Sequence, residues 1–307
     1  MKKYISSLLI LSLLTFFMYG CQSTPKWETN IIYEEIDIEE VTTEYNFLFL
    51  TDTHMIVMDE SDTQQMKDNA LPRYAEFQNK EGIASADQFE TWIKYANDNS
   101  IDGVLFGGDI IDYPSQANID HFEKNLQNLS VPYLYTLGNH DWTYPWDYMT
   151  ESGKTTYIPM LETFTGSNPT IHSMEYDEFI IVAIDNSTTQ FSQEALNSFK
   201  EIIAKGKPVI LMIHVPLLTQ SVLGRAREIR GADKRIVLGG GNYGGIYPNE
   251  VSTEFMNLIV SETSPVELVL AGHVHFYDKD YIEGAHPVLQ IVGDAGYNGS
   301  AIHLTIK

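Results

Sequence analysis

Short apolar runs alternate along the chain with segments in which apolar residues recur at helical spacing. The runs predict strands at 47–50, 104–106, 133–137, 180–184, 209–213 and 268–270. The helical spacing predicts helices at 86–98, 119–129, 193–204 and 250–261. This alternation is typical of an α/β fold, in which helices pack on the outside of the sheets. Residues 31–41, where acidic and apolar residues alternate irregularly, are a plausible edge strand.

Polar residues gather where the predicted strands end. Five clusters follow apolar runs, in the order Asp52-Thr53-His54, Gly107-Gly108-Asp109-Ile110-Ile111-Asp112, Gly138-Asn139-His140-Asp141, His214 and Gly272-His273-Val274-His275. The carboxyl ends of strands form the crevice of an α/β sheet, so clusters distant in sequence can meet there. Residues i and i+2 of an extended segment project to the same side, so a carboxylate and an imidazole can share one cation.

A single cluster of this kind is more often a capping or hydrogen-bonded residue, because buried polar groups need partners. Here all five occur together and in order. The pattern D-x-H, G-D-x-x-D, G-N-H-D, H, G-H-x-H resembles the calcineurin-like metallophosphoesterase family over about residues 46–275. The resemblance implies a two-sheet β-sandwich flanked by helices, in four layers, and an enzyme that hydrolyses phosphate esters with a metal-bound hydroxide.

The resemblance also implies two divalent metal ions. One would be held by Asp52, His54, Asp109 and His275, and the other by Asp109, Asn139, His214 and His273. Asp109 would bridge the two ions. Neutral imidazoles and carboxylates suit Mn, Fe or Zn. Two such ions, about 3.5 to 4 Å apart, can bind a phosphoryl oxygen and supply a hydroxide at neutral pH.

Three further residues of the clusters are candidates for catalysis. In the resembled family, the imidazole at the place of His140 stabilises the transition state or protonates the leaving oxygen. Asp112 and Asp141 are candidates to accept a hydrogen bond from an imidazole and fix its tautomer. The alternative for both is that they are loop or helix-capping carboxylates.

Departures from family subpatterns narrow the substrate class. Protein serine/threonine phosphatases resemble one another in an Arg-Gly after the second motif and a Glu after Asn-His, where this chain has Tyr113-Pro114 and Asp141. Purple acid phosphatases have a tyrosine at the place of Asp112. The pattern is more similar to the branch that hydrolyses small phosphodiesters and phosphomonoesters.

The charge balance bears on the substrate as well. With 42 acidic and 19 basic residues, a net charge of −23 argues against a general nucleic-acid surface or an anionic membrane surface. An anionic substrate must therefore be captured locally. Five basic residues lie close together, at Arg225, Arg227, Arg230, Lys234 and Arg235. Arg225 and Arg227 are candidates to bind phosphate oxygens; the alternative is a solvated helix or loop face.

The N-terminal segment resembles a bacterial lipoprotein signal. Lys2 and Lys3 precede an apolar stretch of 17 residues that ends at Gly20, and Cys21 is the only cysteine. Cleavage before Cys21 and lipid on its sulfur would tether the protein to a membrane. The alternative is an uncleaved anchor, although this length is at the lower limit for a span. Both interpretations place the domain outside the cytoplasm, in the bacterial cell envelope. The expected organisation is a signal at 1–21, a tether and edge strand at 22–45 and the catalytic domain at 46–307.

The main alternative to an enzyme is a tethered lipoprotein that binds metal or phosphate without turnover. Such a binding module would not need His140, and decayed sites usually lose ligands, whereas every motif position is present here. A single cysteine also excludes a thiolate zinc site within the domain. The sequence therefore favours a metal-dependent enzyme with a small phosphorylated substrate.

Overall fold

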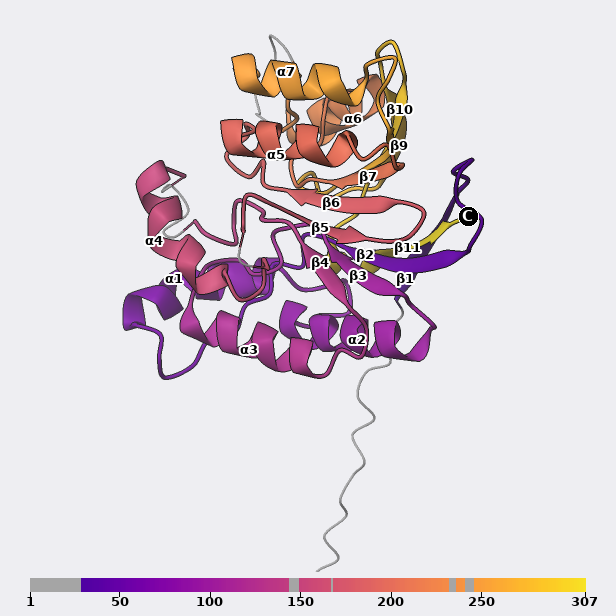
Figure 1. The fold of residues 1–307 in the computed structure, drawn as a ribbon. Coiled ribbons are helices and arrows are strands. Elements are labelled where there is room, and N and C mark those ends of the chain that lie inside the picture. Colours follow the sequence, from indigo (N-terminus) through magenta and orange to yellow (C-terminus); the bar gives the residue numbers. More distant parts are fainter. Residues whose placement is uncertain (1–28, 144–148, 167, 232–235, 241–245) are drawn as a thin grey trace, which may run out of the picture.

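The computed structural model describes residues 29–143, 149–166, 168–231, 236–240 and 246–307 (Figure 1). The predicted signal, Cys21, Lys234 and Arg235 lie outside the described residues. Two mixed sheets lie face to face, and helices cover the outer face of each, so the predicted fold class is confirmed. Within the described parts of the chain, no helix has the length and apolar character needed to cross a membrane.

The first sheet has the strand order β1-β11-β2-β3-β4. Its strands are β1 (Asn30–Ile36), β11 (Ser300–Ile306), β2 (Tyr45–Leu50), β3 (Gly103–Phe106) and β4 (Tyr133–Tyr135). β2, β3 and β4 run parallel, so the loops that follow them emerge at the same end of the sheet. β1 and β4 are the edge strands, and β1 pairs in parallel with β11.

The second sheet has the order β5-β6-β7-β8-β10-β9. Its strands are β5 (Ile171–Glu175), β6 (Ile180–Ile184), β7 (Val209–Met212), β8 (Val266–Ala271), β10 (Val288–Val292) and β9 (Asp278–Ile282). The four central strands are parallel, and β5 and β9 are antiparallel to their neighbours. The loops after β7 and β8 therefore also emerge side by side.

The helices are α1 (Gln64–Glu76), α2 (Ser85–Asp98), α3 (Gln116–Gln127), α4 (Glu151–Leu161), α5 (Gln193–Ile203), α6 (Gln220–Arg230) and α7 (Glu250–Ile259), with a short 3₁₀ helix η1 (Gly296–Asn298). α2 and α3 cover the first sheet, while α5 and α7 cover the second (Figure 1).

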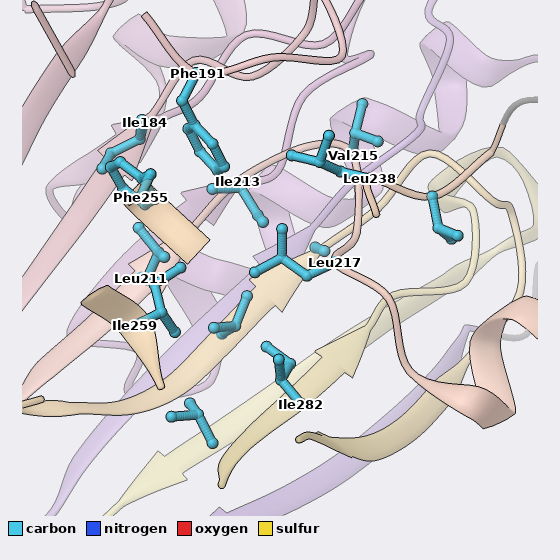
Figure 2. Packing of buried hydrophobic residues seen from close by; sticks show 14 of the residues in the cluster. Ile184, Phe191, Leu211, Ile213, Val215, Leu217, Leu238, Phe255, Ile259 and Ile282 are labelled. Atoms are coloured by element: carbon cyan, nitrogen blue, oxygen red, sulfur yellow. The ribbon is translucent and has the colours of Figure 1, made fainter. Parts of the chain in front are cut away.

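Alternate residues of β2 show how the layers are held together. Phe47 and Phe49 pack between the two sheets, whereas Leu48 and Leu50 pack toward α2 and α3. On the outer face of the second sheet, Phe255 of α7 stacks on Phe191 at 4.0 Å between ring centroids (Figure 2). Both faces of each sheet are thus buried against another layer, and the sheets form a rigid support for the loops at their ends.

The sequence pattern predicted many of the elements, including the edge strand expected within 31–41, which corresponds to β1. Four predicted helices correspond to α2, α3, α5 and α7, and six predicted strands to β2, β3, β4, β6, β7 and β8. α1, α4 and α6 were not predicted, because Pro72, Pro159 and Gly224 lie inside them and lower helix propensity. β5, β9, β10 and β11 were also missed.

Candidate metal centre

The five polar clusters meet at the ends of the two sheets. Asp52, Asp109 and Asn139 follow the parallel neighbours β2, β3 and β4, whereas His214 and His273 follow β7 and β8. The first two loops are also joined directly, since the Asp52 amide donates to the Gly108 carbonyl at 3.0 Å and the His54 amide to the Asp109 carbonyl at 3.0 Å. The sheet geometry therefore brings together side chains that are up to 223 positions apart, from Asp52 to His275.

The backbone at the clusters adopts an unusual conformation. Among the described residues, seven other than glycine have positive φ, and five of the seven are candidate metal ligands: Asp52, His54, Asp109, His273 and His275. The left-handed region costs free energy for residues with a Cβ, so it persists only where the surrounding fold imposes it. Strain of this kind is concentrated at functional sites.

Glycines allow the loops to approach one another closely. A Cβ at Gly138 would lie 2.1 Å from the Asp109 amide nitrogen, and one at Gly272 would lie 2.0 Å from Thr51 Oγ1. Gly108 has φ of +87°, and a Cβ there would lie 2.7 Å from His214 Nδ1. The glycines of the second, third and fifth clusters are therefore needed for contact between the loops.

One group of candidate ligands consists of Asp52, His54 and His275. The Nε2 atoms of His54 and His275 are 3.0 Å apart, and Asp52 Oδ1 lies 3.3 Å from His275 Nε2. Asp52 is held by the hydroxyl of Thr51 at 2.7 Å and by the His273 amide at 2.8 Å. One carboxylate and two imidazoles thus converge on one point.

The other group consists of Asp109, His214 and His273. Asp109 Oδ2 lies 3.1 Å from His214 Nε2, and His214 Nε2 lies 3.3 Å from His273 Nδ1. The same Asp109 oxygen is 3.9 Å from His54 Nε2, which belongs to the first group. Asp109 therefore lies between the two groups, where a bridging carboxylate is expected.

The donor atoms fit divalent metal ions. Two pairs of imidazole nitrogens face each other at 3.0 and 3.3 Å, so that each pair can share a proton or bind one cation. Burial lowers the pKa of His54 to about 4 and that of His273 to about 3, so both rings are neutral at pH 7. The Oδ1 atom of Asn139 is buried without a hydrogen-bond partner within the described structure, which a metal ligand would explain.

Three of the imidazoles are oriented by a partner on the ring nitrogen that points away from the centre. His54 Nδ1 is 3.0 Å from Asp112 Oδ1, His214 Nδ1 is 2.9 Å from the Gly107 carbonyl, and His275 Nδ1 is 3.2 Å from the Tyr297 hydroxyl. Such partners fix the ring orientation of metal-binding histidines. Although burial opposes it, the charge of Asp109 raises the pKa of His214 to about 10.

His140 lies beside the first group and is paired with Asp112. Its Nδ1 is 3.1 Å from Asp112 Oδ1 and 3.2 Å from the Asp112 carbonyl, and its backbone amide donates to Asp109 Oδ1 at 2.7 Å. The side chain is 22% exposed, whereas that of His54 is 1% exposed, so a substrate can reach His140. Although burial opposes it, the charges of Asp109 and Asp112 raise the pKa of His140 above its ordinary value.

Arg73 of α1 was not predicted to belong to the site. Its guanidinium donates to both carboxylate oxygens of Asp112 and lies 3.3 Å from His140 Nδ1. Although burial opposes it, these hydrogen bonds hold the pKa of Asp112 well below its usual range. His54, Asp112 and His140 are close enough together to ligate an ion, but the cation that Asp112 already binds is Arg73. No motif surrounds Arg73, so the sequence contained no signal for it.

Asp141 is directed to the backbone. Its carboxylate accepts hydrogen bonds from the amides of Gly138, Asp109, Ile110 and Ile111, at 2.7 to 3.1 Å. It thereby joins the loop after β4 to the loop after β3, next to Asp109. Of the two roles considered for this residue, these contacts favour the structural one. Asp112 shows the other role, because it accepts from imidazoles.

Of the basic residues on α6, Arg230 contacts the loop that carries His273 and His275, whereas Arg225 contacts the chain beyond it. Arg225 donates to the Tyr277 carbonyl at 2.8 Å and lies 4.9 Å from the Phe276 ring centroid, so its guanidinium packs on the protein. Arg227 is half-buried on the same helix. Arg230 at the end of α6 donates to the Val274 carbonyl at 3.1 Å, between the two histidines of the fifth cluster. Phosphate binding by Arg225 and Arg227 stays a prediction.

Comparison with known proteins agrees with this geometry. The family model described as calcineurin-like phosphoesterase matches residues 45–277. No curated protein matches the sequence significantly. A dimetal phosphatase from Danio rerio is similar in structure, with a TM-score of 0.50 and 13% identity over 83% of this chain and 88% of that chain.

The purple acid phosphatase from yellow lupin (Lupinus luteus) seeds is also similar, with a TM-score of 0.55 and 17% identity. The match covers 86% of this chain but 46% of the lupin chain, so this protein spans less than half of that enzyme. At such low identities the two structures show a shared fold.

Proposed function

The chain belongs to the calcineurin-like phosphoesterase family, and we propose that this hydrolase cleaves small phosphodiesters or phosphomonoesters at two divalent metal ions. The observation that carries the proposal is the pair of ligand groups with Asp109 between them. Asp52, His54, His275 and Asp109 would hold one ion, and Asp109, Asn139, His214 and His273 the other. Nitrogen and oxygen donors suit Mn, Fe or Zn alike.

The bound ions would offset the negative charge of the phosphoryl group and lower the pKa of a water molecule so that it can attack phosphorus. The chain's own residues supply the remaining steps. Asp112 and the Asp112 carbonyl both face His140 Nδ1, which places the proton on that nitrogen and leaves Nε2 for the substrate. A raised pKa favours the protonated ring, so His140 can donate a proton to the leaving oxygen.

A cavity lies near the end of β6, although neither the candidate ligands nor His140 line it. Its volume is about 580 Å³, within the usual range for small-molecule sites, and its walls include Lys154, Asp185 and Thr188. Lys154 lies 5.6 Å from the ring centroid of Trp142. Trp142 follows His140 by two positions, and its indole N–H donates to Ser187 Oγ at 2.8 Å. Hydroxyl, amide and charged groups predominate along the walls, so the cavity suits a small polar molecule.

A binding lipoprotein without turnover is the second candidate. Metal binding alone requires only the ligands, and it does not require a partly exposed imidazole held by a carboxylate. The arrangement of His140, Asp112 and Arg73 therefore favours turnover.

Turnover can be tested on the purified protein after chelation and reconstitution with Mn, Zn or Fe. We expect metal-dependent hydrolysis of bis-p-nitrophenyl phosphate or p-nitrophenyl phosphate, measured as p-nitrophenolate release. Preference for the first substrate would establish a phosphodiesterase, and preference for the second a phosphatase. If calorimetry shows that metal binds but neither of these esters nor any ester of a wider panel is hydrolysed, the binding protein is favoured instead.

We also propose attachment to the bacterial cell envelope through lipid on Cys21, on the strength of the sequence. Cys21→Ser is expected to move the protein from the detergent-extracted membrane fraction to the soluble fraction or to leave an unprocessed precursor. Immunoblotting of fractions and the mass of the mature chain measure this. A fully processed, membrane-bound Cys21→Ser protein would contradict lipid attachment at this residue.

A further inference from the structure

We infer that Arg73 is a positioning residue for His140 and acts through Asp112; the inference rests on the proposed function. Arg73 lies in the last turn of α1, outside the motifs that define the metal centre. Its side chain nevertheless reaches the pair of residues on which proton transfer depends, with Nε and Nη2 directed to the two oxygens of Asp112.

The last turn of α1 is fitted closely to the centre. The Phe77 amide donates to the Arg73 carbonyl at 2.9 Å and so ends the helix. The Phe77 ring stacks on His54 at 4.2 Å with an interplanar angle of 5°, and the Arg73 guanidinium lies 4.9 Å from the same ring. Ala70, one turn earlier, is fully buried. Arg73 is therefore anchored by its helix, by Phe77 and by Asp112.

One oxygen of Asp112 faces two imidazoles. Its Oδ1 atom lies 3.0 Å from His54 Nδ1 and 3.1 Å from His140 Nδ1. A carboxylate on a single bond to its Cβ can rotate, and rotation would favour one ring over the other. The planar fork of Arg73 binds both oxygens at once, which fixes the plane of the carboxylate and keeps Oδ1 between the rings.

Loss of Arg73 would therefore release His140 from its working orientation. Of the candidate metal ligands, His54 shares this oxygen of Asp112, but it also stacks on Phe77, which stays in place. Two simpler roles make different predictions. An arginine that bound the substrate phosphate would act mainly on KM. An arginine that only stabilised the fold would lower the melting temperature, and its effect on turnover would not depend on His140.

The experiment is a double-mutant cycle on the metal-reconstituted enzyme, with p-nitrophenyl phosphate or bis-p-nitrophenyl phosphate, whichever the wild type hydrolyses faster. We expect Arg73→Ala to lower kcat about 10- to 100-fold with little change in KM, as for other partners of metal-site histidines. Arg73→Lys should restore only part of kcat, because an ammonium group cannot bind both oxygens in the same plane. In the His140→Ala background, Arg73→Ala should cause little further loss, since the two residues act as a unit.

Lys67→Ala is the matched control, because it removes one positive charge from the same helix outside the centre; its kcat should equal that of the wild type. A kcat of Arg73→Ala equal to the wild type, a change confined to KM, or equal losses with and without His140 would each overturn the inference. Absence of turnover in the wild type would instead contradict the proposed function. The two failures are therefore distinguishable.

Discussion

Asp109→Asn is expected to lower kcat at least about 10³-fold and to reduce bound metal, because it removes the carboxylate that lies between the two ligand groups. Asp109 Oδ2 lies 3.1 Å from His214 Nε2 and 3.9 Å from His54 Nε2, so its charge acts on both groups. An amide is nearly the same size but is neutral and offers a single oxygen. Metal content by elemental analysis and kcat by p-nitrophenolate release measure the two effects.

Asp120→Asn provides the control for a lost carboxylate. Asp120 is exposed on α3, where it accepts from Gln116 Nε2 at 2.6 Å, and its loss should leave metal content and kcat unchanged. If Asp109→Asn keeps both ions and its kcat is within tenfold of that of the wild type, Asp109 does not bridge the ions.

The candidate metal centre is predictable from the sequence because its ligands occur in short clusters directly after strands. Asp52 and His54 are separated by one position and belong to the same ligand group, whereas His273 and His275, with the same separation, belong to different groups. The glycines beside Asp109 and Asn139 have a similar local cause, since they permit the close approach of two loops. Ordered motifs of this kind depend little on distant parts of the chain.

The remaining parts of the site depend on contacts that local patterns do not contain. Arg73 is supplied by α1, a helix with Pro72 inside and without a motif. Tyr297 reaches His275 from η1, which lies after the last strand of the second sheet in the chain. Neither residue stands at a recognisable spacing from the partner that it touches.

The same reason explains the missed strands. β11 pairs with β1 and with β2, so the end of the described chain is inserted between two strands from its beginning. β9 has the sequence DKDYI, in which charged residues outnumber apolar ones, and it forms an edge of the second sheet. Pairing of such strands is decided by the sheet that receives them, not by their own hydrophobic pattern.

Asp141 shows how a motif can be found while its role stays open. The sequence places this carboxylate next to His140, which allows either an imidazole partner or a backbone partner. The structure directs it to four amides, one of which is that of Asp109. The direction of the Asp141 side chain depends on the loop after β3, against which its own loop packs. That loop includes Ile111, 30 positions earlier in the chain.

His140→Ala is expected to lower kcat about 10²- to 10⁴-fold while both metal ions stay bound. Among the described residues, the His140 backbone amide donates to Asp109 Oδ1 at 2.7 Å, and alanine keeps that amide. The His140 ring meets the candidate ligand His54 only edge-on, at 4.7 Å between ring centroids. Asp112 would still be held by Arg73 and would still orient His54. The loss should therefore fall on proton transfer and not on metal binding.

The leaving group makes this test specific. If His140 protonates the leaving oxygen, the loss in kcat should be larger for phenyl phosphate than for p-nitrophenyl phosphate, because p-nitrophenolate leaves without a proton. His286→Ala is the control for a lost imidazole; its backbone amide donates to the Val260 carbonyl at 2.9 Å, which alanine preserves. Loss of the metal ions in His140→Ala would place His140 among the ligands, and equal losses for both esters would leave transition-state stabilisation, without proton donation, as its role.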